Sequence, residues 1–329
     1  MNRALLLLRR RLLGAIPVLL IVIVGTFFLL EAAGGDAVDA YIGAIGGDAG
    51  LAAELRADWG LDQGPLQRLA FYLWRLLHFD LGYSVAFSRP ISELLLDRLP
   101  NTLLLMGTAI ALSFGIGSLL GIAAGSRPGS VRDRALSAAG LALYAVPGFW
   151  LGLVLSLVFT VQLRWLPLAG FETAASRLRG WDRFVDILRH LVLPAASLGL
   201  IYLALYLRVM RAGMAEIWRQ DFVRALRARG LSHRRIVWRH VARNALLPLV
   251  TMLGLQSATM LGGSVVIESV FAYPGLGSLA DRAIDERDTP LLLGIILAGA
   301  VTAILVNLVV DIVYALLDPR VGAGDGAPA

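Results

Sequence analysis

Residues 99–126 read LPNTLLLMGTAIALSFGIGSLLGIAAGS, a run of 28 residues with no charged side chain and no histidine. A helix of about 20 apolar residues is long enough to span the hydrocarbon core of a bilayer. The run is too long for a strand of a membrane β-barrel, which needs about 10 residues of alternating character. It therefore predicts a transmembrane helix.

Five further runs of this kind lie along the 329 residues and contain 19, 29, 17, 24 and 22 residues. The chain is 57% hydrophobic and only 16% charged, whereas a soluble protein carries about a quarter of charged residues. We therefore predict an all-α polytopic membrane protein. Its six transmembrane helices are expected at about residues 11–31, 101–125, 136–163, 191–210, 245–268 and 290–316.

The first of these runs has an alternative interpretation as a signal peptide. Its core of 19 residues is longer than the usual 7–15, and no clear small-residue cleavage site follows it. We expect a retained helix.

The distribution of arginine predicts the orientation. All 30 basic residues are arginine, and they are frequent in the N-terminal tail, in residues 127–134 and in residues 211–243. In residues 32–97 and 269–288 the acidic residues outnumber them, although residues 164–189 carry five arginines against the trend. Because cytoplasmic loops are enriched in positive charge, both termini are expected in the cytoplasm. The excess of arginine that gives the net charge of +6 is thereby accounted for by the orientation of the loops in the membrane. No nucleic-acid partner is expected.

Two residue types are absent, and their absence excludes several chemistries. Without cysteine there is no disulfide, thiolate metal site or cysteine nucleophile. Without lysine the chain cannot carry a P-loop ATPase site, since that loop needs its lysine on the nucleotide phosphates. The four histidines are scattered, so we expect no metal site, no cofactor and no catalytic residue in this chain.

One polar segment stands out between the fourth and fifth predicted spans. Residues 211–245 read RAGMAEIWRQDFVRALRARGLSHRRIVWRHVARNA. Asp221 stands where an N-cap belongs, and Gly230 stands where a left-handed cap ends a helix. Between them Phe222, Ala225, Leu226 and Arg229 follow at helical spacing. From composition alone, this helix either rests on anionic lipid or docks into a groove of a soluble partner.

The same segment resembles the cytoplasmic Glu-Ala-Ala loop of bacterial ABC-transporter permeases, most closely those of the dipeptide, oligopeptide and nickel branch. The matching runs are DFVRALRARGLS at 221–232 and RHVARNALLP at 239–248, although Arg224-Ala225-Leu226 occupies the Glu-Ala-Ala slot. Other matches cover nearly the whole chain: LRADWGLDQGP at 55–65, DLGYS at 80–84, RPI at 89–91, RLPNTL at 98–103, ESVFAYPGLG at 268–277 and DPR at 318–320.

The resemblance implies a fold, partners and a role for this loop. It implies a type I importer permease in the bacterial inner membrane, paired with a second related permease subunit. Two cytoplasmic ATPase subunits would bind ATP and Mg²⁺ and contact the loop, and an extracytoplasmic binding protein would deliver the solute. The coupling residues carried over by the resemblance are Asp221, Phe222, Ala225, Leu226, Arg229 and Gly230.

The solute is expected to be a di- or oligopeptide, with nickel complexes and glutathione-like or opine-like compounds as alternatives. We divide the chain into a cytoplasmic tail with the first span (1–31), an extracytoplasmic segment (32–100), a five-helix core (101–317) that includes the coupling loop 211–245, and a cytoplasmic tail (318–329). Short helices are expected to begin at Asp48, Pro65 and Pro90 of the extracytoplasmic segment.

Uncharged polar residues within the spans are candidates for the translocation path. We select Gln256, Ser257, Thr259 and Asn307, although helix-to-helix hydrogen bonds explain such residues equally well. Glu268, near the outer end of a span, is expected to be interfacial. An ion-coupled carrier would normally bury carboxylates near mid-membrane, and a membrane enzyme would need a convergent nucleophile and base. Neither pattern is evident in the sequence.

The six-span topology predicts which side of the membrane each loop faces. Reporter fusions or cysteine labels at Gly60, Gly129, Gly180, Gly230 and Gly275 should report outside, inside, outside, inside and outside. Position 180 is the most informative, because its segment carries the arginines that run against the charge bias. An inside signal there would contradict the six-span arrangement.

Overall fold

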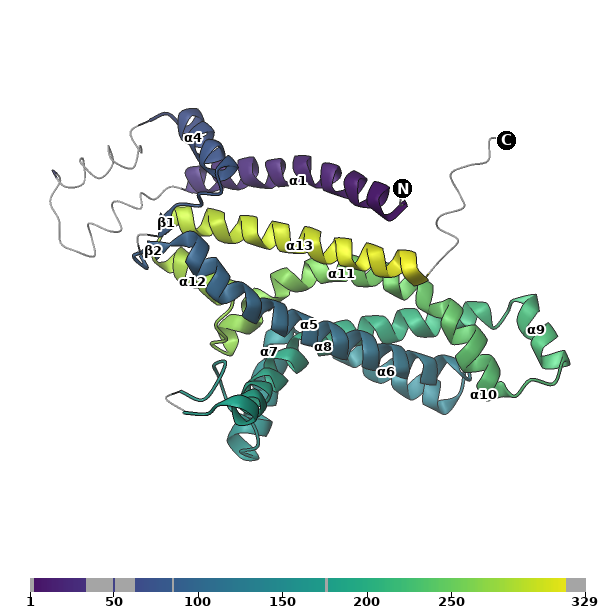
Figure 1. Ribbon diagram of the computed structural model, residues 1–329. Helices are drawn as coiled ribbons and strands as arrows, with labels where there is room; N and C mark the ends of the chain where they lie inside the picture. Colours follow the sequence, from purple (N-terminus) through teal and green to yellow (C-terminus); the bar gives the residue numbers. More distant parts are fainter. Residues whose placement is uncertain (1–2, 34–49, 51–62, 85, 175–176, 318–329) are drawn as a thin grey trace, which may run out of the picture.

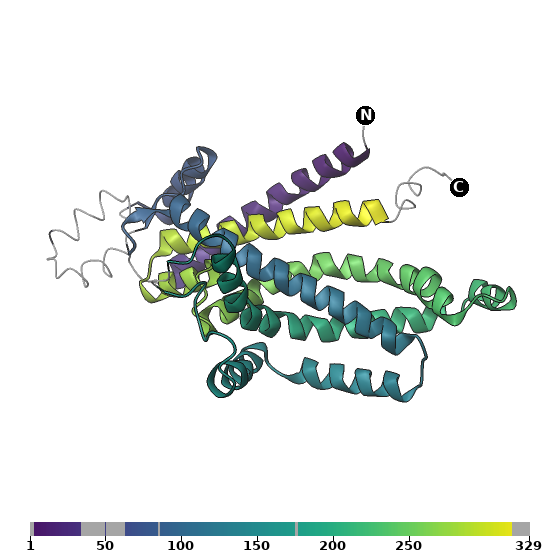
Figure 2. The same ribbon diagram turned by 60° about the horizontal axis from the view of Figure 1, so that its bottom comes forward.

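The computed structural model describes residues 3–33, 50, 63–84, 86–174 and 177–317. The helix predicted from Asp48 and the tail 318–329 lie outside these residues. In the described part the regular elements are helices apart from two short strands, and the long helices run lengthwise beside one another (Figure 1, Figure 2).

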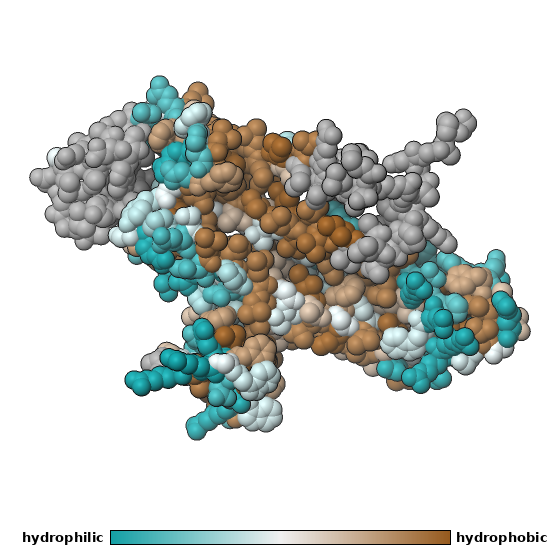
Figure 3. All heavy atoms as spheres, in the orientation of Figure 1, coloured by the Kyte–Doolittle hydropathy of each residue, from teal (hydrophilic) through white to brown (hydrophobic). Residues whose placement is uncertain are grey.

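Five long helices are apolar enough to cross a membrane. They are α1 (Arg3–Ala33), α5 (Ile91–Gly125), α8 (Gly180–Ile217), α11 (Ala242–Val270) and α13 (Thr289–Leu317). Their side chains form a broad apolar belt on the surface, with polar residues gathered toward its two ends (Figure 3). This belt is the surface expected of a bundle within a bilayer.

The third predicted span is not a single straight helix. It consists of α6 (Val131–Ala145), followed by α7 (Gly148–Ser156) and the π-helical turn η1 (Leu157–Gln162), with a bend of 100°. Between the two helices, Pro147 forces Val146 out of the helical region, to φ −88° and ψ 128°. The sixth candidate span is therefore a bent helix pair.

The start of the second predicted span also differs from the sequence interpretation. A short helix from Pro90 was expected to meet Pro100 and give way to the span, but the structure has one helix, α5, that runs through Pro100. The boundary between the predicted extracytoplasmic segment and core thus falls inside a continuous helix. The helix expected from Pro65 is present as α4 (Pro65–Leu77).

Smaller elements close the end of the bundle opposite the coupling loop. β1 (Tyr83–Ser84) and β2 (Arg89–Pro90) form an antiparallel pair, and α12 (Leu276–Asp285) lies between α11 and α13. Apolar residues of α5, α12 and α13, among them Ile91, Leu279 and Leu291, form one buried cluster there. α4 packs on α1 and α13 through a second, smaller cluster.

The most extensive contact in the bundle joins α5 and α8. It is made by glycines four residues apart on α5, which let the helix axes approach closely. A Cβ added at Gly121 would lie 2.5 Å from Met210 Cβ and 2.8 Å from the Leu207 carbonyl oxygen, and Gly117 and Gly125 are similarly close to α8. Two other glycines of α5, Gly107 and Gly115, have no described atom within 4 Å of an added Cβ and take no part in this contact.

Replacing glycines of α5 by alanine should distinguish the effect of helix packing on stability from the effect of helix propensity. We expect Gly121→Ala to destabilise the protein by about 1–3 kcal/mol, because the methyl group forces α5 and α8 apart. Gly115→Ala is the matched control, since it meets no atom and should be neutral or stabilising by up to about 1 kcal/mol. Melting temperatures of both variants in one detergent measure the difference, and equal values would contradict the close contact.

Candidate functional site

The predicted coupling loop forms the tip of the bundle. After α8 ends at Ile217, the chain forms α9 (Asp221–Ala228), turns, and continues through α10 (His233–Ile236) and η2 (Val237–Val241) into α11. α9 and α10 project beyond the ends of the long helices (Figure 1). The projecting part is therefore accessible to a partner.

Both ends of α9 are close to the sequence prediction. The helix begins one residue earlier than expected, since Gln220 is the N-cap and Asp221 is the first helical residue, paired with Arg224 at 3.3 Å. At the other end Gly230 has φ +76°, as predicted. The Gly230 amide donates to the Arg227 carbonyl and the Leu231 amide donates to the Leu226 carbonyl, which is a complete Schellman motif.

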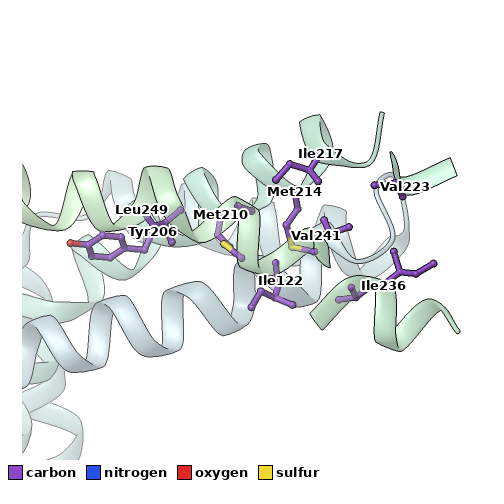
Figure 4. Packing of buried hydrophobic residues seen from close by; sticks show 12 residues of the cluster. Ile122, Tyr206, Met210, Met214, Ile217, Val223, Ile236, Val241 and Leu249 are labelled. Carbon is purple, nitrogen blue, oxygen red and sulfur yellow. The ribbon is translucent and has the colours of Figure 1, made fainter. Parts of the chain in front are cut away.

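The two faces of α9 differ from the sequence interpretation. The fully buried residue is Val223, which the sequence analysis did not select, and Leu226 packs partly against the same cluster. Phe222 is 38% exposed, and Ala225 and Arg229 are exposed as well. Val223 and Ile236 lie at one end of a cluster that extends along α8 and α11 (Figure 4). α9 is thus held by Val223 and presents Phe222 outward.

Trp218 connects four helices at the base of the projection, and the sequence analysis missed it. Its indole N–H donates to the carbonyl of Gly125 at the end of α5, at 2.7 Å. Its ring stacks on His233 of α10, with centroids 5.4 Å apart and planes at 3°. The Arg227 guanidinium of α9 lies 4.9 Å from the same ring, within range of a cation–π interaction.

An ion pair connects the start of α6 to α8 at the same end. The Arg211 guanidinium donates to both carboxylate oxygens of Asp133, with the Nη2 to Oδ2 distance at 3.0 Å. Asp133 also accepts from the Gly129 amide at 2.8 Å, and its side chain is 1% exposed. Bidentate pairs of this kind fix geometry as well as contributing energy. α6 therefore cannot shift without α8.

The four residues chosen for the translocation path do not form one group. Ser257 is buried and donates to the Leu253 carbonyl of its own helix. Asn307 lies where α13 crosses α11, and a Cβ added at Gly254 would lie 3.3 Å from its Oδ1. Thr259 is exposed and donates to the Gln256 carbonyl, and Tyr202 of α8 donates to Thr259 at 3.5 Å. Tyr202 joins this group without having been predicted.

The exposed stripe of α11 is mixed in polarity. It carries Asn244, Thr251, Thr259 and Gly262, together with Leu255 and Val266, which are 69% and 49% exposed. The corresponding exposed residues of α13 are all large and aliphatic: Val301, Leu305, Val309 and Ile312. A surface with side-chain amide and hydroxyl groups is suited to a polar path, while that of α13 is suited to lipid.

Glu268 was expected to be interfacial, and this expectation is wrong. It is fully buried at the end of α11, where it accepts from the Thr102 hydroxyl at 2.8 Å and from the Gly277 amide at 2.7 Å. The Ser278 amide donates to the same carboxylate, so Glu268 caps the first turn of α12. Its close neighbour Gly277 has no room for a Cβ, which would lie 2.4 Å from Val265 Cα.

Sequence runs far apart in the chain meet around this carboxylate. Asn101 donates to the Pro274 carbonyl at 2.7 Å, and the Tyr273 hydroxyl donates to the Asn101 carbonyl. At the same end of the bundle, Ser84 of β1 donates to Asp288, just before α13, at 2.6 Å. The runs at 98–103 and 268–277, which carried the family resemblance, are therefore hydrogen-bonded to each other, and the run at 80–84 is bonded to the start of α13.

Together these features define a multi-pass membrane protein with a group of buried, hydrogen-bonded polar residues at one end and an exposed helix, held by Val223, at the other. Residues 117–323 match the family model described as binding-protein-dependent transport system inner membrane component. The chain belongs to this family of permease subunits of ABC transporters.

Full-length relatives agree with this assignment. The chain is 37% identical over 328 residues to the di/tripeptide transport system permease protein of Pseudomonas aeruginosa, covering 95% of this chain and 97% of the relative. It is 35% identical over 313 residues to the oligopeptide transport system permease protein of Bacillus subtilis, covering 95% and 98%. It is also 35% identical over 333 residues to the dipeptide transport system permease protein of Escherichia coli K12, covering 95% and 97%.

A solved structure shares the fold. A chain of the MetNI methionine ABC transporter, in an inward-facing conformation, superposes with a TM-score of 0.56 at 18% identity, covering 69% of this chain and 97% of that chain. The predicted type I importer permease fold is confirmed.

The burial of Val223 yields a test of how α9 is held. Val223→Ala removes two buried methyl groups and should destabilise the attachment of α9 by about 1.5 kcal/mol or more. Hydrogen exchange of the α9 amides should accelerate accordingly. Ala225→Ser, on the exposed face of the same helix, should leave their exchange unchanged; acceleration in this control instead would contradict the assignment of faces.

Proposed function

We propose that this chain forms one half of the translocation path of an importer for di- or oligopeptides. A second related permease subunit supplies the other half, two cytoplasmic ATPase subunits supply the energy, and an extracytoplasmic binding protein delivers the solute. The observation that carries the proposal is α9, which projects from the bundle on a left-handed Gly230 cap with Phe222 facing outward.

The ATPase subunits dock on the exposed face of α9, which carries Phe222, Ala225 and Arg229. An aromatic ring flanked by small and charged residues suits a groove on a soluble partner. ATP and Mg²⁺ bind to those subunits, because this chain has no lysine from which a P-loop could be built. Leu226 contributes less to docking than the sequence suggested, since it packs partly on its own chain.

A movement imposed on α9 reaches four helices of the bundle. Val223 ties α9 to the cluster between α8 and α11, and Trp218 ties the base of the projection to α5. The Asp133–Arg211 pair extends the connection to α6. These elements are packed together and not flexibly linked. A movement of α9 is therefore transmitted to the helices that move during alternating access.

The hydroxyl and amide groups on the exposed stripe of α11, with Gln256 and Tyr202 hydrogen-bonded to Thr259, line the path that faces the second permease. Ser257 and Asn307 serve helix packing instead. An ion-coupled carrier is not favoured, since the buried Glu268 is occupied in capping α12.

The peptide assignment is supported by the relatives, which are named as di/tripeptide, dipeptide and oligopeptide permeases. Nickel complexes and glutathione-like or opine-like compounds remain the alternative solutes, and the binding protein makes the choice. The family supports a location in the bacterial inner membrane, and the arginine distribution supports an orientation with both termini in the cytoplasm.

Docking on α9 can be tested with two variants. Phe222→Ala should remove about 1 kcal/mol of contact, since 38% of the side chain is available to a partner. That is roughly a fivefold loss of affinity for the ATPase. Gly230→Val adds backbone strain of about 1–2 kcal/mol and should lower solute uptake while membrane insertion stays intact.

Co-purification of the ATPase and solute uptake are the measurements. If Phe222→Ala retains both, while replacement of Arg224 and Arg229 releases the segment from anionic membranes, then α9 lies on lipid and the docking assignment is wrong.

A further inference from the structure

The exposed side of α4 is mostly apolar, unlike the exposed side of an amphipathic helix that faces water. Its inner side, with Leu69, packs against Phe27 of α1 and Leu293 of α13. Its outer side carries large apolar residues that contact nothing in the described chain over most of their surface: Leu66, Phe71, Trp74 and Leu77, which are 57–75% exposed. A helix facing water would place polar residues there.

α4 has two charged residues, and each forms an ion pair. Arg68 pairs with Glu31 of α1, and Arg75 donates to Asp80 at 2.8 Å. The hydrogen bonds that Asp80 accepts from Arg75 and from the Gly82 amide hold the pKa of Asp80 below its ordinary value. The exposed face is mostly apolar, although it includes Gln67 and the Arg75 guanidinium lies at its edge, 5.8 Å from the Phe71 ring.

The turn after α4 is a second, independent observation. The Phe79 amide donates to the Leu76 carbonyl and the Asp80 amide to the Arg75 carbonyl, which makes Phe79 the left-handed residue of a Schellman motif. That place usually belongs to glycine, yet Phe79 has φ +58° and is 93% exposed. A bulky aromatic residue that is both strained and exposed indicates a contact beyond the described residues.

The position of α4 identifies that contact as lipid. α4 crosses the end of α1 (Figure 1), to which it is joined by the Arg68–Glu31 pair and by the stacked rings of Tyr72 and Phe27. α1 is a candidate span with little of its surface covered, and Leu29 near this end is 72% exposed. α4 thus packs at the end of a helix whose exposed surface is expected to lie in the bilayer.

We propose that α4 and Phe79 form an in-plane anchor in the membrane leaflet on the side predicted to be extracytoplasmic, with Trp74, Leu77 and Phe79 inserted among the lipids. Tryptophan, arginine and large apolar residues are typical of helices at the bilayer interface. The anchor adds a lipid contact to the packing of α1 on α13, where Phe27 meets Leu293.

Spin labelling of the transporter in nanodiscs tests the proposal, and it does not depend on which solute is carried. The chain has no cysteine, so Trp74→Cys and Leu77→Cys each receive a single nitroxide. Leu29→Cys serves as the lipid-facing control, and Glu286→Cys, exposed at the same end of the bundle, serves as the water-facing control. Collision rates with oxygen and with a water-soluble nickel chelate are compared.

The ratio of oxygen to nickel accessibility at positions 74 and 77 should be close to that of the Leu29→Cys label and several-fold above that of the Glu286→Cys label. A ratio equal to that of Glu286→Cys would overturn the anchor. Shielding from nickel that arises only when the solute-binding protein is added would overturn it as well, because the face would then dock a protein. Unchanged elution of each labelled variant confirms its fold.

Discussion

The close approach of α5 and α8 is the contact on which the other features depend. In lipid, apolar side chains gain little by leaving the solvent, so association relies on van der Waals packing at short distance. Gly117, Gly121 and Gly125 provide that distance. α8 then packs against α6, α7 and α11, and just beyond its end Trp218 donates to the Gly125 carbonyl. The helix pair that forms the core thus also positions the projecting helix.

The two ends of the bundle hold their polar groups by different means. At one end, the buried Glu268 takes three donors and draws α5, α11 and α12 together, which leaves no free charge in an apolar setting. At the other end, the polar groups of α9 stay exposed and only Val223 is buried. One end is consequently a buried hydrogen-bonded group and the other an exposed surface.

The short sequence runs that mark the family form the contacts at these two ends of the bundle. Asn101, Thr102, Glu268 and Pro274 meet in one hydrogen-bonded group, although they lie up to 173 residues apart. The run around Gly230 forms a complete helix cap, and Arg224 in the Glu-Ala-Ala slot points away from the cluster that holds α9. An acidic residue is therefore not needed at that position for the helix to be held.

The sequence by itself determined the six apolar segments, the helix from Pro65 and the left-handed cap at Gly230. The partition of an apolar segment into lipid and the steric limits on the backbone both depend on residues within one segment. Only the tertiary structure decided that Val223 rather than Leu226 is the buried residue of α9, that Glu268 is a buried cap, and that Thr259 and Asn307 lie in different environments. Each of these depends on contacts between distant segments. Pro147 could have indicated the bend, but it lies within a run of 29 uncharged residues, which the sequence analysis interpreted as one straight span. Hydropathy reports that a segment prefers lipid, and it carries no information about the direction in which the segment runs or the face it turns to its neighbours.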